Sequence, residues 1–388
     1  MKKSLIILIF FLLFILFYTC NIDNIPESIV LLKNEKISIN TLYGIEFKEE
    51  NYVNTSTSSL GESSIKKVNV TLGGIKVKQV NVTILPEVEV IPIGKIVGLK
   101  LYTSGILVVG INENILNESD IKEGDAIISI NNEKVESIEN IKSIVEKSNG
   151  EDLLVKYIRD NDEILVSTIS PVKTEDNSYK LGLWVKEGAT GVGTISFYNP
   201  ETNDFAALGH GVYDKDTGEL LKIEEGSLLN SKVISISKGE YGMPGEIKGA
   251  LIEDDKLGDI EKNTEFGIYG SLNINNISSN DKIKVASRSE IKKGLAYILC
   301  SIDGNEPKEY EIEIENINIE NNINNRSMKI RITDEELIEK TGGIICGMSG
   351  CPIIQNGKLI GVVTNVLVNN SEVGYGVFAD LMLKEMIK

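Results

Sequence analysis

The chain of 388 residues carries a formal net charge of −17, with 41% hydrophobic and 25% charged residues. This length suggests more than one domain, and the composition is sufficient for a sizeable buried core. The negative charge repels nucleic-acid phosphates and anionic membrane surfaces, so neither a nucleic-acid-binding protein nor one held electrostatically on a membrane is expected.

The first twenty residues have the features of a targeting segment. Lys2 and Lys3 precede an apolar run over 5–18, which is shorter than the roughly 17–25 residues of a membrane span but suits a signal peptide or short signal anchor. Residues 17–20 (FYTC) lack the small residues of a cleavage site. We therefore expect an uncleaved anchor over 1–20, with the lysines in the cytosol and the rest exported. A cleaved secretory signal is the alternative.

Residues 21–94 are predicted to be a stem with a small β region. The polar stretch 21–60 indicates a linker or weakly structured stem. Valines alternate with polar residues on both sides of Gly73-Gly74, which predicts a hairpin within 66–92.

Residues 95–178 show a different order of elements. The pattern predicts strands over 106–109 and 126–130, a helix over 138–147, and strands over 153–158 and 164–169. This order, with the GDAIISIN segment beginning at Gly124, resembles a PDZ domain of exported bacterial proteases. Such a domain binds an extended peptide at a sheet edge, and the resemblance implies that Val97, Gly98 and Leu99 cradle its terminal carboxylate. A small mixed α/β domain is the alternative.

Residues 179–388 are rich in glycine and in short strands. Strands are predicted over 191–198, 233–237, 266–272, 283–286 and 359–368, which indicates a β sandwich or barrel. A helix is predicted over 333–341, capped by Thr333 or Asp334 and ending before Gly342. The fold class is therefore mainly β (α+β).

The segment Gly347-Met348-Ser349-Gly350-Cys351-Pro352 resembles the nucleophile turn of chymotrypsin-type peptidases. A tight turn of this kind exposes the serine hydroxyl, and the amides of Gly347 and Ser349 would form the oxyanion hole. A glycine-rich loop also produces Gly-x-Ser-Gly by chance, so the motif needs a base to support it.

His210 is the only histidine of the chain and lies between Gly209 and Gly211. A serine hydroxyl needs a base near neutral pH, and imidazole usually serves. His210 follows a predicted strand and lies far upstream of Ser349, as in chymotrypsin-type enzymes. The alternative is a structural histidine in a turn.

Together, the PDZ-like segment, Gly209-His210-Gly211, Thr341-Gly342-Gly343 and the serine turn resemble the SpoIVB family of sporulation serine peptidases, from about residue 80 to the C-terminus. Cys351 departs from the family pattern, where a small residue such as serine is expected. The resemblance implies a chymotrypsin-like double β-barrel over 179–388. It also implies self-cleavage, and cleavage of a membrane-associated regulatory protein between mother cell and forespore. That cleavage would release an intramembrane protease and trigger late sigma-factor processing.

The acid of the triad is Asp334 by the same resemblance, with the task of orienting His210 and stabilising its imidazolium. Asp334 could also be a helix N-cap, and Asp214 and Asp204 are rival acids near His210. A second hypothesis is a non-catalytic adaptor, in which the PDZ domain recruits a partner and the barrel is a degenerate peptidase scaffold.

No metal or cofactor is expected, because the chain has no CxxC pair and a single histidine. The four cysteines are Cys20, Cys300, Cys346 and Cys351. Whether any of them pair stays open; Cys346 and Cys351 lie on either side of Ser349.

Overall fold

The structure is a computed structural model that describes Thr19, Ile22 and residues 25–35, 37, 45–58, 61–112, 119–159, 163–273, 281–304, 306–318 and 325–387. The predicted anchor over 1–20 lies outside these residues, apart from Thr19. Within the described ranges, no helix is both long and apolar enough to cross a membrane.

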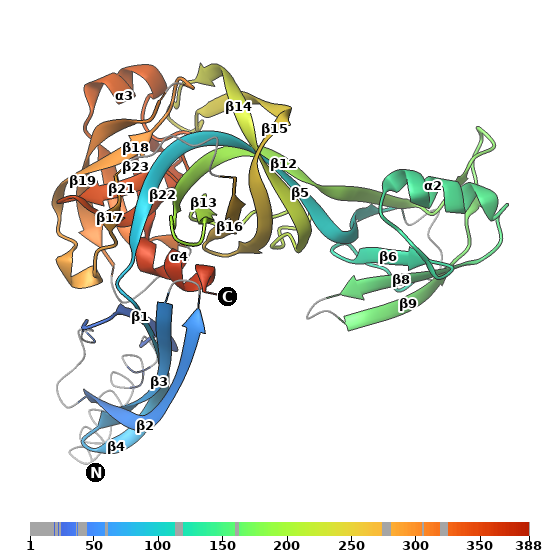
Figure 1. Cartoon of the computed structure of the whole chain (residues 1–388). Helices are drawn as coiled ribbons and strands as arrows, with labels where there is room; N and C mark the ends of the chain where they lie inside the picture. Colours follow the sequence, from blue (N-terminus) through green and yellow to red (C-terminus); the bar gives the residue numbers. More distant parts are fainter. Residues whose placement is uncertain are drawn as a thin grey trace, which may run out of the picture.

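The N-terminal region is a four-stranded sheet in the order β1-β4-β3-β2, which extends below the rest of the molecule in Figure 1. The predicted hairpin is present: β3 (Gly61–Leu72) and β4 (Ile75–Leu85) join through Gly73 and Gly74, which have positive φ. The predicted stem, however, contains β1 (Ser28–Leu32) and β2 (Ile45–Ser58). β2 is rich in polar residues and β1 has only five residues, so neither gives a strong strand pattern; both pair with the strands of the hairpin.

Six strands form a first barrel. They are β5 (Glu89–Ile111), β12 (Leu183–Tyr198), β13 (Asp204–Ala207), β14 (Ile223–Ser237), β15 (Glu246–Thr264) and β16 (Gly267–Leu272). Each pairs with the next in the order β12-β13-β16-β15-β14-β5, and β12 also pairs with β5, which closes the ring. Its core contains Val97, Leu99, Ile195, Phe205 and Leu228.

A second barrel is closed in the order β18-β19-β20-β23-β22-β21. Its strands are β18 (Gly294–Cys300), β19 (Lys308–Ile317), β20 (Met328–Ile332), β21 (Pro352–Gln355), β22 (Lys358–Leu367) and β23 (Asn370–Phe378). The short strand β17 (Ile283–Lys284) pairs with β5 and precedes this barrel. Figure 1 shows the two barrels side by side, so the expected mainly β, double-barrel fold is confirmed.

Two helices accompany the second barrel. Helix α3 (Glu335–Thr341) begins after the N-cap Asp334 and ends at Gly342, whose φ is 72°. This confirms the predicted helix and its end, since glycine adopts the left-handed conformation at low cost. Helix α4 (Ala379–Met386) follows β23 and buries much of its surface against the barrels.

A small domain lies to one side of the barrels (Figure 1). It contains β6 (Ala126–Ile130), the two-residue β7 (Glu133–Lys134), α2 (Ile138–Lys147), β8 (Leu153–Arg159) and β9 (Glu163–Ile169). A two-stranded sheet of β10 (Val172–Lys173) and β11 (Tyr179–Lys180) follows. The predicted order of strands and helix is observed.

The GDAIISIN segment has a structural explanation in this domain. The buried Asp125 carboxylate accepts the Lys122 amide at 2.7 Å and both Nε and Nη2 of Arg159, at 2.8 and 2.7 Å. Asn131 has a φ of 50°, and its side-chain oxygen accepts the Leu154 amide at 2.8 Å. These residues fix the loops on both sides of β6.

The small domain is built into the first barrel. The core of the small domain begins at Ile106 in β5 and extends to Leu183 and Val185 in β12, so both strands run from one body into the other. The predicted boundary at 95 therefore falls in the middle of a barrel strand, because β5 turns toward the small domain only near Gly105, whose φ is 96°.

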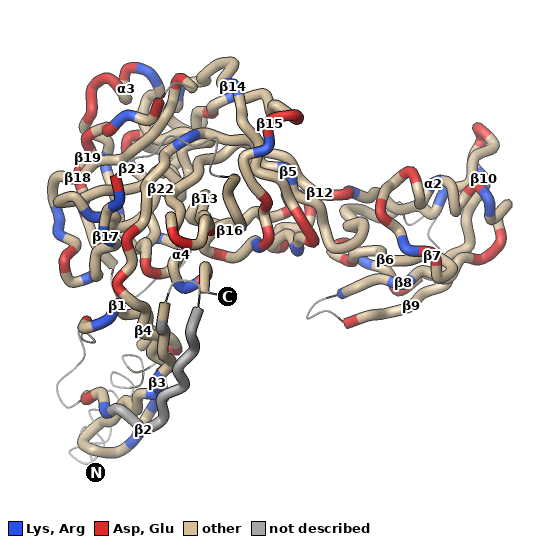
Figure 2. The backbone as a smooth tube through the Cα atoms, in the orientation of Figure 1, with Lys and Arg blue, Asp and Glu red and all other residues tan. Residues whose placement is uncertain are grey.

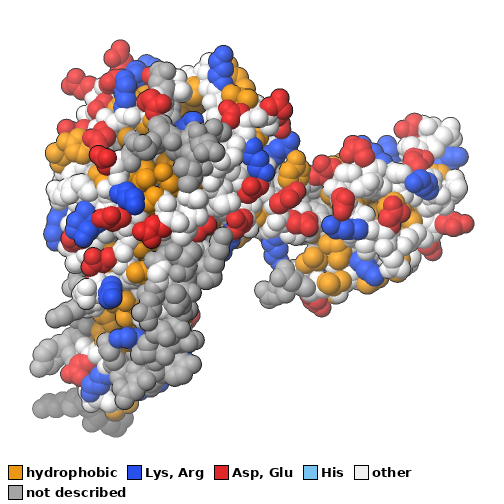
Figure 3. Space-filling view, in the orientation of Figure 1, with side chains coloured by type: hydrophobic (Ala, Val, Ile, Leu, Met, Phe, Trp, Pro, Cys, Tyr) orange, Lys and Arg blue, Asp and Glu red, His pale blue; other side chains and the backbone are white. Residues whose placement is uncertain are grey.

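The charge is spread over the whole molecule. Figure 2 shows Asp and Glu along all parts of the described backbone, with Lys and Arg among them. Figure 3 shows hydrophobic side chains gathered along the lower side of the small domain; Leu154 of β8 and Ile164 and Val166 of β9 are exposed.

Candidate active site

The serine turn and the histidine turn come from different barrels and meet at their junction. The Gly350 amide donates to the Val363 carbonyl at 2.7 Å, and a Cβ on Gly350 would lie 2.7 Å from the Leu208 nitrogen. A Cβ on Gly209 would lie 2.4 Å from Val362 Cγ2. Ser349 and His210 are thus each next to a residue that packs against the same stretch of β22.

The backbone of the serine turn leaves two amides unused. The amides of Cys346, Met348, Gly350 and Cys351 all donate to backbone carbonyls. Within the described ranges, the amides of Gly347 and Ser349 have no hydrogen-bond acceptor. These are the two predicted oxyanion-hole donors, so the turn leaves the expected pair available for a ligand oxygen.

Thr194 of β12 fixes this turn from the first barrel. The Thr194 hydroxyl donates to the Gly347 carbonyl at 2.7 Å, and the Thr194 amide donates to the Ser349 carbonyl at 3.2 Å. Thr194 is fully buried, whereas Ser349 is half-buried. No local pattern indicates Thr194, because its role depends on a contact between residues 153 positions apart.

Two glycines are required by close packing in the turn. Gly350 has a φ of 99°, and a Cβ there would lie 2.2 Å from the Thr194 carbonyl oxygen. Gly347 has a φ of 103°, and a Cβ there would lie 3.1 Å from Ile247 Cβ. The Gly-x-Ser-Gly pattern therefore has a steric basis at this position.

The approach to His210 is a strained turn. Leu208 and Gly209 both have a φ of 71°, a conformation that a leucine seldom adopts. These two residues turn the chain out of β13. Backbone strain of this kind is often retained where a side chain must be presented in one orientation.

The His210 ring is oriented by the backbone. Its Nδ1 lies 2.9 Å from the Gly211 carbonyl oxygen. A carbonyl can only accept, so the proton resides on Nδ1 and Nε2 is left as the basic nitrogen. Burial lowers the pKa of His210 below its ordinary value of 6.5, against the opposing effect of the Gly211 hydrogen bond. Burial thus favours the neutral form of the ring. The described contacts include no hydrogen bond between this ring and the Ser349 hydroxyl.

The described contacts of the Asp334 carboxylate lie at the start of α3 and on β19, and they do not include His210. The Asp334 carboxylate accepts the Leu337 amide at 2.9 Å and the Glu311 amide at 3.3 Å, so it is the N-cap of α3. Asn325, before β20, donates to the Gly209 carbonyl beside His210 at 3.4 Å, whereas Asp334 follows the other end of that strand. The five residues of β20 span about 16 Å. The N-cap interpretation is therefore the one that the geometry supports.

The two rival acids are engaged elsewhere. The buried Asp214 accepts Lys186 Nζ at 3.1 Å and the amides of Asp216 and Thr217. Burial opposes ionisation of Asp214, but these hydrogen bonds hold its pKa below the usual value. Asp204 begins β13, at the opposite end of that strand from His210.

The predicted carboxylate cradle is wrong in position. Val97, Gly98 and Leu99 lie in the middle of β5, paired on one side with β12 and on the other with β14. Val97 and Leu99 are buried in the barrel core. Both edges of this stretch are occupied, so no peptide strand can be added to it.

The small domain offers a different groove. The stretch Leu183–Lys186 of β12 pairs with β5, and within the described ranges its other edge is unpaired. A cavity of about 690 Å³ lies between this stretch and α2, lined by Ile138, Ile141 and Val145 of the helix. Gly182, with a φ of 74°, precedes the open strand. Sequence spacing missed this edge because it follows the last small-domain strand by more than ten residues.

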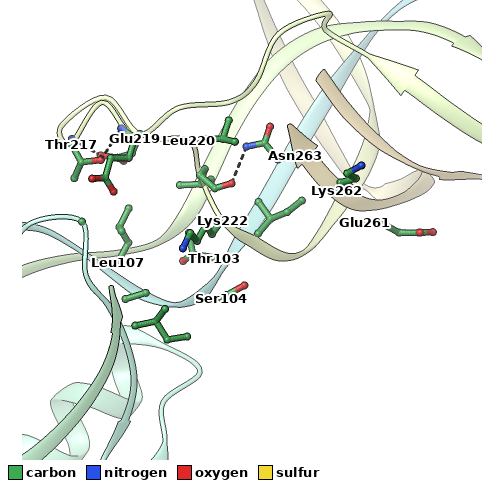
Figure 4. Close-up of a pocket in the computed structure, with 16 residues that line it drawn as sticks. Thr103, Ser104, Leu107, Thr217, Glu219, Leu220, Lys222, Glu261, Lys262 and Asn263 are labelled. Atoms are coloured by element: carbon green, nitrogen blue, oxygen red, sulfur yellow. Dashed lines mark hydrogen bonds between the residues drawn. The ribbon is translucent and has the colours of Figure 1, made fainter. Parts of the chain in front are cut away.

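A second cavity, of about 440 Å³, lies where the small domain joins the first barrel. Figure 4 shows Thr103, Ser104 and Leu107 of β5 facing Leu220, Lys222 and Asn263 across it. Asn263 donates to the carbonyls of Val212 and Leu221 at 2.8 and 2.9 Å and accepts the Val212 amide at 2.9 Å. Asn263 thus fixes the chain that leaves His210.

Comparisons with known proteins give a family match and a weak structural similarity to a PDZ domain. The family model for the SpoIVB peptidase S55 matches residues 177–383, more than half of the chain, and includes both His210 and Ser349. No curated protein matches the chain. Among solved structures, the PDZ domain of an SdrC-like protein from Listeria monocytogenes is similar, with 14% identity and a TM-score of 0.19 over 21% of this chain and 86% of that chain.

Proposed function

Since the chain belongs to the SpoIVB peptidase S55 family and is therefore a serine peptidase of sporulation, we propose that Ser349 is its nucleophile and His210 its general base. The observation that carries this proposal is the serine turn itself. Among the residues that the structure describes, the amides of Gly347 and Ser349 have no acceptor, whereas those of Cys346, Met348, Gly350 and Cys351 are all bonded.

The proposed chemistry uses few groups. Nε2 of His210 removes the hydroxyl proton of Ser349 as the oxygen attacks the scissile carbonyl carbon. The amides of Gly347 and Ser349 stabilise the negative charge on the carbonyl oxygen. His210 then protonates the leaving amine, and water, activated by the same ring, hydrolyses the acyl-enzyme.

We assign the orienting role to the Gly211 carbonyl rather than to Asp334. The carbonyl accepts the Nδ1 proton at 2.9 Å and fixes the tautomer, which is one of the two tasks of a triad acid. A neutral carbonyl stabilises imidazolium less than a carboxylate does, so a modest turnover rate is expected.

The substrates are proposed from the family. The chain would cleave itself near its N-terminus and cleave a membrane-associated regulatory protein, which would activate an intramembrane protease and late sigma-factor processing. The groove between α2 and Leu183–Lys186 would bind an extended peptide by strand addition. Residues 1–20 would anchor the chain, with the catalytic part between mother cell and forespore. Isolation of a mature chain that lacks residues 1–20 would contradict the anchor.

Covalent labelling tests the catalytic assignment without a known substrate. The full chain in detergent is treated with diisopropyl fluorophosphate, and the modified residue is identified by mass spectrometry. We expect modification of Ser349, no labelling in Ser349→Ala, and strongly reduced labelling in His210→Ala. Ser235→Ala, which alters an exposed serine of β14, is the matched control and should label normally. Equal labelling of the Ser349→Ala and parent chains would refute the proposal.

Self-cleavage is followed with the same variants. The parent chain should lose N-terminal fragments over time, and Ser349→Ala should stay intact. Identical fragmentation of the two proteins would assign the cleavage to another protease and favour the adaptor hypothesis.

A further inference from the structure

Two buried cysteines lie against each other directly beneath the serine turn. Cys300 ends β18 and Cys351 follows Gly350, and both are fully buried. Both side chains belong to the same hydrophobic core, and the two thiols are close enough to influence each other. In this structure both are thiols, as is the exposed Cys346.

The strand register sets these two cysteines opposite each other. In the antiparallel pair of β18 and β21, Tyr297 pairs with Ile354 and Ile298 with Ile353. Cys300 and Cys351 lie two positions beyond the last of these pairs, and the same register extended to them would set them opposite each other. Opposed residues in an antiparallel pair have Cα atoms about 4.5–5.5 Å apart, which lies within the range of about 4.4–6.8 Å that a disulfide requires.

Cys351 also contacts the residue that fixes the serine turn. Its Sγ lies 3.9 Å from the hydroxyl of Thr194, and that hydroxyl donates to the Gly347 carbonyl. A bond at Cys351 would therefore be made two residues from Ser349, on a side chain in contact with Thr194.

We propose that Cys300 and Cys351 are an oxidation site that forms a cross-strand disulfide, joining β18 to the base of the serine turn. The oxidant is a small-molecule disulfide. One cysteine thiolate attacks it and releases one thiol, and the second cysteine attacks the resulting mixed disulfide and releases the other. Two S–H bonds are lost, one S–S bond forms, and two electrons pass to the oxidant, which ends as two thiols.

The pair reacts during folding rather than in the native chain. Contact with Cys351 and burial raise the pKa of Cys300 well above its ordinary value, and a thiol held protonated is a poor nucleophile. The same burial shields the completed bond from reductants. Cys346 is exposed, so it should exchange with glutathione in the folded protein. It therefore serves as an internal standard.

Disulfide mapping tests the proposal and does not depend on peptidase activity. The full chain is unfolded, refolded in detergent with an excess of oxidised glutathione or with a reductant, alkylated and digested. We expect the oxidised sample to contain a peptide pair linked through Cys300 and Cys351, lighter than the sum of the two free peptides by two hydrogen atoms. We also expect Cys346 to carry glutathione or the alkylating group. Alkylation of both Cys300 and Cys351 in that sample, or a link from either to Cys346 or Cys20, would overturn the proposal.

Two variants complete the test. Cys300→Ala should lose the linked peptide, and Cys346→Ala should retain it. The refolded oxidised parent chain should show an upward shift in Tm relative to its reduced form, and Cys300→Ala should show no such shift. An equal shift in Cys300→Ala would mean that oxidation acts at another cysteine.

Discussion

The Thr194 hydroxyl donates to the Gly347 carbonyl over 2.7 Å, and this hydrogen bond joins the first barrel to the serine turn of the second. With the Thr194 amide bonded to the Ser349 carbonyl, one residue of β12 fixes the peptide groups before and after the Met348–Ser349 peptide. The Gly347 and Ser349 amides are thereby held in place before any substrate arrives. Such preorganisation is what makes an oxyanion hole effective.

Removal of that hydroxyl should weaken catalysis. In Thr194→Val the buried Gly347 carbonyl loses its donor, at a cost of about 1–3 kcal/mol, and we expect labelling of Ser349 by diisopropyl fluorophosphate to slow by roughly tenfold to a hundredfold. Thr194→Ser retains a hydroxyl and should label at close to the parent rate. Slow labelling by both variants would indicate a packing defect rather than loss of the hydrogen bond.

Gly350 should tolerate no side chain. A Cβ there would lie 2.2 Å from the Thr194 carbonyl oxygen at a φ of 99°, so Gly350→Ala should lose Ser349 labelling and unfold at a lower temperature. Gly357→Ala is the matched control, because Gly357 also has a positive φ of 71° but has no atom within 4 Å of a Cβ. Only the backbone strain of about 1 kcal/mol applies to that control. Thermal unfolding followed by circular dichroism compares the two.

Asp334 should matter for stability and little for catalysis. Asp334→Ala removes the N-cap of α3, and the free energy of unfolding should fall by about 1 kcal/mol. Asp334→Asn retains a good cap and should leave both stability and the rate of Ser349 labelling close to the parent values. A loss of several thousandfold in the Asn variant, as for a true triad acid, would return the orienting role to Asp334.

The rate of Ser349 labelling at acidic pH should depend on the protonation of His210. Protonated imidazole cannot accept the Ser349 proton, so the labelling rate falls as pH drops through the pKa of His210. Burial places that pKa below 6.5, with the Gly211 hydrogen bond acting in the opposite direction, and the midpoint of the limb should lie below 6.5 accordingly. A midpoint above that value would require an anion near the ring. The free energy of unfolding should also decrease at acidic pH. His210 has the higher pKa in the unfolded state, so the unfolded chain binds the proton first as the pH falls, and stability is lost between the unfolded and the folded pKa.

Arg159 should be needed for the small domain. Arg159→Ala leaves the buried Asp125 carboxylate without its bidentate partner, and loss of one member of a buried pair typically costs about 3–5 kcal/mol. Lys134→Ala removes exposed ion pairs with Glu136 and Glu224 and should leave the small domain unchanged. Urea unfolding, monitored by hydrogen exchange of β6 and β8, distinguishes these outcomes.

Local patterns were enough to predict much of this molecule. Helix α2, strand β6 and the α3 cap follow from periodicity, turn residues and capping chemistry, all of which act within a few residues. The Ser349 and His210 turns carry their own glycine signatures, whose steric reasons are visible at Gly350 and Gly209.

The rest depended on contacts between distant residues. Nothing near Thr194 in the sequence indicates its bond to Gly347, and nothing near Val97 indicates that two strands enclose it. The role of Asp334 as the triad acid rests on resemblance to a family. Its position relative to His210 depends on the direction in which β20 runs. β2 cannot be predicted from its polar composition, because its pairing with β3 makes it a strand.

The sharing of β5 between the small domain and the first barrel has a consequence for how the chain must fold. The segment 177–383 that matches the peptidase family does not contain β5, which covers Glu89–Ile111. Without this strand, β12 and β14 would both present open edges, and such edges favour aggregation. The catalytic region is therefore not an autonomous folding unit, and the barrel that carries His210 can close only after the chain on both sides of the small domain has been made.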